Sequence, residues 1–123
     1  MHSRHELLIA VYAAFNRRDV ETVLALMHPN VDWPNAMGGG RVRGHDEVRA
    51  YWRRQWDIID PRVEPLRMAD DETGNTVVDV HQVVRDLSGS VLKDMLVKHV
   101  YCFRDGLIER MDIRNVVGPT HQA

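Results

Sequence analysis

The C-terminal half of the chain contains the run TVVDVHQVVRDLSGSVLKDMLVKHVYCFRDGLIERMDIR, residues 76–114. Apolar and polar residues alternate along it, and polar clusters containing glycine interrupt it at 86–89 and 104–106. Alternation with a period of two, broken by such turns, predicts β-strands joined by hairpins. Together with the stretch 62–69 and the polar cluster 70–75 that follows it, the run predicts four consecutive strands.

The N-terminal half has helical spacing instead. Apolar residues recur every three or four positions over 4–17, 19–27 and 45–59. This spacing predicts three amphipathic helices. Asp19 is placed to cap the second helix, and Pro29 prevents that helix from continuing.

A short strand and a glycine-rich loop separate the second and third helices. We predict a brief strand over residues 31–33. Pro34 either confines this strand to an edge of the sheet or marks its end. The loop 35–40 contains three consecutive glycines, which permit unusual backbone angles at an entropic cost. Such a loop is either a mobile flap or a plain surface loop, and the sequence leaves both open.

Helices followed by strands predict an α+β fold with an antiparallel sheet. One face of the sheet must carry the three N-terminal helices. A twisted, curved sheet around them forms a cone, and the open end of a cone is a natural small-molecule pocket. Residues 1–123 fit one domain, because a chain of this length buries about two-thirds of its unfolded surface around a single core.

The composition argues against several classes of function. The chain is 44% hydrophobic and 28% charged, with a formal net charge of −2. We therefore expect neither disorder nor binding to nucleic acid or an anionic membrane. No apolar run approaches the ~18 residues of a membrane span. The single cysteine, Cys102, excludes an intrachain disulfide, and with no signal-like N-terminal run it favours a cytoplasmic location.

The order of three motifs resembles a known superfamily. FNRRD (15–19) joins the first two helices, Gly44 precedes the third, and FRDGLI (103–108) forms the last hairpin. In this order they resemble the nuclear-transport-factor-two-like superfamily and, more narrowly, its SnoaL-like polyketide cyclase and ketosteroid isomerase branch. The resemblance covers nearly the whole chain and implies the cone fold. This superfamily hosts isomerases, cyclases, dehydratases, epoxide hydrolases and binders without catalytic activity.

The catalytic residues of the isomerase carry over poorly. The resemblance places the family's general-base aspartate at Trp33, before Pro34, and its oxyanion tyrosine at Val11, with Tyr12 one residue away. Its second oxyanion donor, an aspartate, corresponds to His99. The match therefore argues against ketosteroid isomerisation by that mechanism.

His99 is the leading catalytic candidate. Over 95–103 the row that contains His99 and Tyr101 is the more apolar one, which turns it inward. A buried imidazole beside a tyrosine hydroxyl can act as a general acid or base on a bound ligand. A hydrogen-bonded core histidine is the alternative, with equal weight.

The turn between two strands decides which polar side chain joins His99. A two- or four-residue turn over 86–89 brings Gln82 to its face, whereas a three-residue turn brings Asp79 and His81. The apolar alternation of the strand favours Gln82.

Aromatic residues complete the predicted pocket. Trp33 lies at a strand-to-loop junction, and such junctions face clefts. Trp52 and Trp56 on the third helix are either core residues or a platform for the ligand. The predicted substrate contacts are Tyr12, Trp33, Trp52, Trp56, Gln82 and Met111.

Charged residues alternate with apolar ones on the last strand. The pleat sends Arg110, Asp112 and Arg114 outward if Met111 points inward. An inward arrangement would resemble the carboxylate and guanidinium array of epoxide hydrolases with this fold. Surface charges or contacts at a dimer interface are the favoured interpretation.

We expect a cofactor-independent enzyme, without a metal, that acts on a hydrophobic small molecule by proton transfer. His99 would be the acid or base, and Tyr101 or Gln82 would orient the substrate. The alternative is a non-catalytic ligand-binding or interaction domain, motivated by the loss of the family's aspartate base. Members of the family commonly pair through the outer face of the sheet, so we also expect a homodimer, with Lys98, Val100 and Cys102 in the contact.

Overall fold

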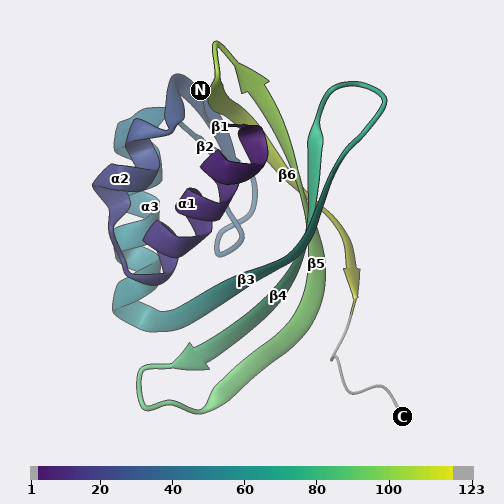
Figure 1. The fold of residues 1–123 in the computed structure, drawn as a ribbon. Helices are drawn as coiled ribbons and strands as arrows, with labels where there is room; N and C mark the ends of the chain where they lie inside the picture. The colour runs from purple at the N-terminus through teal and green to yellow at the C-terminus, as the bar shows by residue number, and fades with distance from the viewer. Residues whose placement is uncertain (1–2, 118–123) are drawn as a thin grey trace.

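The computed structural model describes residues 3–117, which form three helices and a six-stranded sheet. The three helices pack together against one face of the sheet, which curves around them (Figure 1). The predicted α+β cone is confirmed. No helix within the described residues is long and apolar enough to cross a membrane. The elements are α1 (Arg4–Asn16), α2 (Val20–Ala25), β1 (Met27–Pro34), β2 (Arg41–Arg43), α3 (Gly44–Ile58), β3 (Ile59–Asp70), β4 (Thr76–Asp86), β5 (Val91–Arg104) and β6 (Leu107–Val117).

Side-chain caps set the starts of the first two helices. The hydroxyl of Ser3 accepts a hydrogen bond from the amide of Glu6 at 3.1 Å. The carboxylate of Asp19 accepts one from the amide of Thr22 at 3.3 Å, which confirms the predicted cap of α2. Each cap satisfies an amide that has no partner within its helix.

The strand β1 is longer than the sequence predicted. The second helix ends at Ala25, and β1 already begins at Met27 and runs through Pro29. Met27 is buried because it pairs with Ile108 of β6, not because it lies on a helical stripe. The expected strand, 31–33, is only the last part of β1.

The strands follow the order β2-β1-β6-β5-β4-β3. The strands β3 to β6 form successive antiparallel hairpins, as expected. In contrast, β1 pairs with β6 in parallel, so the sheet is mixed and not wholly antiparallel. The short strand β2, which the sequence did not predict, pairs antiparallel with β1 and forms one edge.

A bulge decides which face of β4 points inward. The hydrogen bond from the amide of Asp86 to the carbonyl of Ser90 closes a three-residue turn, 87–89, just before β5 begins at Val91. A turn of this length alone would direct His81 toward the helices. A register shift next to this loop moves the pairing by one residue, so that Gln82 lies opposite Met95. Gln82 therefore shares the inner face with His99, as predicted, although the turn length alone would have given the other answer.

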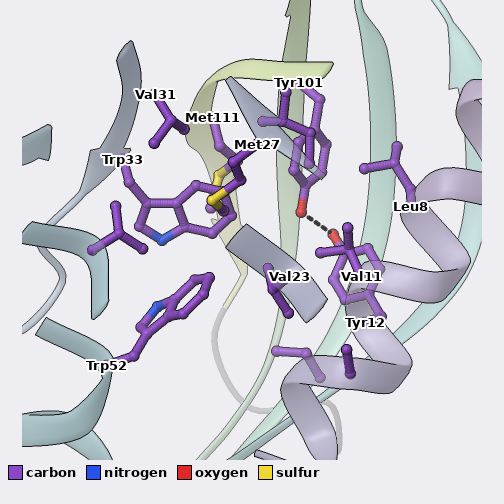
Figure 2. Close-up of a cluster of buried hydrophobic side chains, with 14 of the residues drawn as sticks. Leu8, Val11, Tyr12, Val23, Met27, Val31, Trp33, Trp52, Tyr101 and Met111 are labelled. Carbon is purple, nitrogen blue, oxygen red and sulfur yellow. Dashed lines mark hydrogen bonds between the residues drawn. The ribbon is translucent and has the colours of Figure 1, made fainter. Parts of the chain in front are cut away.

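A single apolar core fills the space between the helices and the inner face of the sheet (Figure 2). Trp52 and Tyr101 are its largest fully buried side chains. The buried face of α3 differs from the apolar spacing Val48, Trp52, Trp56 and Ile59, from which the sequence predicts the buried side of this helix. Trp56 is only half-buried and Ile59 already belongs to β3; the buried residues of α3 are Val48, Tyr51, Trp52 and Gln55.

The free edge of β3 is occupied by a side chain of α1. The side-chain nitrogen Nδ2 of Asn16 donates to the carbonyl oxygen of Val63 at 2.7 Å. The backbone amide of Val63 donates to Asn16 Oδ1 at 2.9 Å. Asn16 thus makes the two bonds that a neighbouring strand would make. The pair fixes the C-terminal end of α1 against the sheet.

Candidate functional site

A cavity of about 70 Å³ lies between α1, α3 and the inner face of the sheet. A single water needs about 10–15 Å³ on this measure, so there is room for a small ligand, and a larger one requires side chains to move. The lining is mostly apolar and aromatic with a few polar groups, as in most ligand sites. The polar lining residues are Tyr12, Tyr51, Gln55, Gln82, His99 and Tyr101.

Three of these residues form a chain of hydrogen bonds. The hydroxyl of Tyr101 donates to that of Tyr12 at 2.8 Å, the bond dashed in Figure 2. Tyr12 Oη lies 2.7 Å from His99 Nδ1. Because the Tyr12 oxygen accepts from Tyr101, its own proton is free to be donated to Nδ1. This assignment, made from the hydrogen-bond network, leaves the proton of the neutral imidazole on Nε2.

Burial keeps this chain uncharged at neutral pH. Desolvation lowers the pKa of His99 to about 4. Desolvation also raises the pKa of Tyr101, and it raises the pKa of Tyr12 with a further contribution from the neighbouring Tyr101. A low-dielectric environment disfavours the charged form of each group. His99 is therefore a neutral hydrogen-bond donor toward the cavity, not a cation.

Tyr51 and Gln55 are polar lining residues that the sequence analysis missed. The hydroxyl oxygen of Tyr51 accepts a hydrogen bond from the amide of Ala36 at 3.1 Å and one from Gln55 Nε2 at 3.3 Å. Both residues lie at helical spacing from the buried Val48, three and seven positions later. That spacing is the signal that predicts their burial.

The glycine-rich loop 35–40 is closed by its own hydrogen bonds. The amide of Asn35 donates to the carbonyl of Gly40 at 3.0 Å, and the carbonyl of Asn35 accepts from the amide of Gly39 at 2.9 Å. Gly39 and Gly40 have φ angles of 78° and 73°, which glycine adopts without strain. The loop is thus a hydrogen-bonded surface loop, and it contributes Ala36 to the wall of the cavity.

The structure brings most of the predicted site residues together. Those that line the cavity are His99, Tyr101, Tyr12, Trp33, Trp52, Gln82 and Met111. Trp56 does not line it, contrary to its prediction as a substrate contact. Its ring packs against Phe15 and Trp52, with centroids 5.4 and 6.0 Å away, and the guanidinium of Arg18 lies over it. Trp56 therefore supports Trp52 from behind.

The charged residues of β6 lie on the opposite face of the sheet. Arg110 contacts Asp32 at 2.7 Å and Asp112 at 2.9 Å, and Arg41 contacts Asp112 at 3.0 Å and also pairs with Asp32. These four residues form a closed ring of ion pairs, which we call the outer ring. None of them lines the cavity. The outward placement of Arg110 and Asp112 is confirmed.

The cone fold is that of the nuclear-transport-factor-two-like superfamily, and the chain belongs to its SnoaL-like domain family, whose sequence model matches residues 8–111. TerC, in a crystal structure with polyporic acid, is 29% identical over 90% of this chain and 89% of its own, with a TM-score of 0.78. An NTF2-like protein of unknown function from Burkholderia pseudomallei is 28% identical over 93% of this chain and 91% of its own, with a TM-score of 0.80.

A more distant solved structure shares the fold alone. This LEH-like epoxide hydrolase from M. tuberculosis is 20% identical over 89% of this chain and 80% of its own, with a TM-score of 0.74. No curated protein matches the chain.

Proposed function

We propose that this protein is a cofactor-independent enzyme that binds an apolar small molecule in the cavity and polarises one of its oxygen atoms with the Nε2–H of His99. The hydrogen bond of 2.7 Å between Tyr12 and Nδ1 is the observation that supports this role, because it leaves Nε2 as the donor. Among the side chains described, those of residues 3–114, none makes a hydrogen bond to Nε2, and the imidazole lines the cavity. A neutral imidazole held in this way stabilises negative charge as it develops on a substrate oxygen.

His99 acts in this proposal as a fixed donor that keeps its proton. If Nε2 lost its proton to the substrate, Nδ1 would take the proton of Tyr12, and Tyr12 that of Tyr101. The chain would then end in a buried tyrosinate, which the raised pKa of Tyr101 opposes. The acidic hydrogen of the substrate therefore leaves to water or to another group of the substrate. Isomerase, cyclase and dehydratase reactions of enolisable carbonyl compounds fit this chemistry.

Binding of a probe to wild type and to His99→Gln tests the role of His99. The relative TerC was crystallised with polyporic acid, so this compound is the first probe. We expect saturable quenching of tryptophan fluorescence in wild type, and affinity about 10-fold lower in His99→Gln, as for the loss of one hydrogen bond to the ligand. The control is His81→Gln, because His81 lies on the outer face, paired with Asp94 at 2.7 Å. Equal affinity in wild type and His99→Gln would contradict the proposal.

Nitrogen magnetic resonance of the imidazole tests the same role without a variant. At pH 7 we expect the proton on Nε2 and an unprotonated Nδ1, with an Nε2 signal that shifts when a ligand binds. An imidazole that titrates near pH 6.5, about the value of a free histidine, and that ignores ligands would lie outside the site and would refute the role.

A non-catalytic ligand-binding domain is the second candidate. The observation that favours it is the absence of an acidic side chain from the cavity lining in the described part of the chain. Exchange of the α-hydrogens of 1-tetralone into deuterated water separates the two candidates. The enzyme accelerates this exchange, and His99→Gln lowers the acceleration by about 10²-fold, the usual contribution of one such donor. A binder leaves the exchange at the rate of the buffer.

A further inference from the structure

Tyr51 has a buried hydroxyl whose oxygen is already occupied. The residue is 3% exposed, and its oxygen accepts hydrogen bonds from the amide of Ala36 and from Gln55 Nε2. With both acceptor positions in use, the remaining polar function of the group is its proton. Among residues 3–114, whose side chains the structure describes, no acceptor takes that proton.

The hydroxyl proton of Tyr51 is available to a ligand in the cavity. One donor approaches the oxygen from the loop 35–40, and the other comes from the next turn of α3. Tyr51 lines the cavity, so a ligand bound there is a candidate acceptor for this proton. Accepted hydrogen bonds polarise a hydroxyl and strengthen it as a donor. Burial raises the pKa of Tyr51, so the proton stays in place at neutral pH.

We propose that Tyr51 is a second ligand-facing donor, so that the cavity selects a rigid, apolar ring compound with acceptor oxygens at two places. His99 projects from β5 and Tyr51 from α3, so the two donors belong to different walls of the cavity. A cyclic diketone or a quinone offers two such oxygens. This inference rests on the proposed function, in which His99 binds the first oxygen, and adds the class of ligand.

A matched pair of probes separates ligand binding from support of the loop. Duroquinone has two carbonyl oxygens on a methylated ring, and durene has the same four methyl groups without oxygen. We expect Tyr51→Phe to lower the affinity for duroquinone by about 3–10-fold, as for one lost hydrogen bond, and to change that for durene less than about twofold. Asn35→Ala is the control, because Asn35 Oδ1 holds the same loop through the amides of Met37 and Gly38 but does not line the cavity. It should retain the wild-type ratio between the two affinities.

An equal loss of affinity for both probes in Tyr51→Phe would mean that Tyr51 only holds the loop, and would overturn the inference. Infrared spectroscopy of duroquinone bound to wild type covers the case of a variant that does not fold. We expect both carbonyl bands to shift to lower frequency, and an unshifted band refutes a second donor. Wild type that shows no saturable binding of duroquinone also refutes the ligand class.

His99→Gln in the same assay distinguishes the two proposals. If only His99→Gln loses affinity for duroquinone, the proposed function stands and the role of Tyr51 is refuted. If only Tyr51→Phe loses it, Tyr51 binds the ligand and the proposed role of His99 fails.

Discussion

The two faces of one strand carry opposite chemistry. On β6, Met111 points into the core, whereas its neighbours Arg110 and Asp112 belong to the outer ring. Inside, the neutral groups of Tyr12, His99 and Tyr101 are hydrogen bonded to one another. Outside, charges pair with charges. The pleat separates the two environments by a single residue. On β6, side chains adjacent in sequence therefore lie on opposite faces of the sheet, and the parity of a position on this strand decides whether it can meet a ligand.

The difference in solvent access explains why each face keeps its own type of polar group. A charge inside the cone would lose its hydration without a partner, at a cost of several kcal/mol, so the groups there stay neutral. The outer ring is partly exposed, with side-chain exposures of 15% for Asp32 and 42% for Arg110. The charges of that ring are therefore stabilised both by water and by their ion-pair partners.

The largest expected effect tests whether the inner face is a packed core. Trp52→Ala should lower the free energy of unfolding by about 3–5 kcal/mol, because it removes a fully buried aromatic side chain. Trp56→Ala should cost distinctly less, since Trp56 is only half-buried behind it. Urea unfolding measures both. Equal losses would show that Trp56 belongs to the core, one of the two alternatives that the sequence left open.

The next effect tests the neutrality of the inner face. An unfolded histidine takes up a proton near pH 6.5, whereas folded His99 does so only near pH 4. Between these values the unfolded state binds the extra proton, so stability is fully present above about pH 6.5 and falls by up to about 3 kcal/mol as the pH drops to about 4. Urea unfolding from pH 7 to 4.5 measures the slope. His99→Gln should flatten it.

The smallest effect belongs to the outer ring. Asp112→Asn should cost about 1 kcal/mol in urea unfolding, and less at high salt, because partly exposed ion pairs are screened. The matched control is Asp105→Asn, in the exposed turn before β6. Affinity for the probes should not change in either variant. A change in affinity for Asp112→Asn would show that the two faces are coupled.

The predicted homodimer also concerns the outer face and remains a prediction. Lys98 and Cys102 are partly accessible there, whereas Val100 is only 2% exposed within the single chain. A contact through this face would therefore rest on the polar neighbours of Val100 and not on Val100 itself.

The sequence predicted what periodicity encodes. Helical spacing located α1 and α3, and alternation with turn clusters located the hairpins from β3 to β6. The strand β2 was not predicted, because three residues are too few to show an alternation of apolar and polar side chains. No local sequence pattern predicts the parallel pairing of β1 with β6. The same is true of the bulge in β4 that places Gln82 on the inner face.

The candidate site was predictable only as separate residues. The alternation of β5 placed His99 and Tyr101 inward, but their hydrogen bonds with Tyr12 join positions 87 and 89 apart in the chain. Such contacts are set by the packing of α1 against the sheet. Tyr51 and Gln55 were missed because a polar side chain on a helix is ordinarily assigned to solvent, although their spacing from Val48 marks the buried side.

The bond pair between Asn16 and Val63 bears on how the protein behaves in a crowded solution. An uncovered strand edge is a template on which a second chain can add its own strand, and repeated addition leads to aggregates. Asn16 occupies the outward-facing amide and carbonyl of Val63, so part of that template is closed from within the same molecule. The last residue of the first helix thus protects colloidal stability, a property on which the cavity and its ligand have no direct bearing.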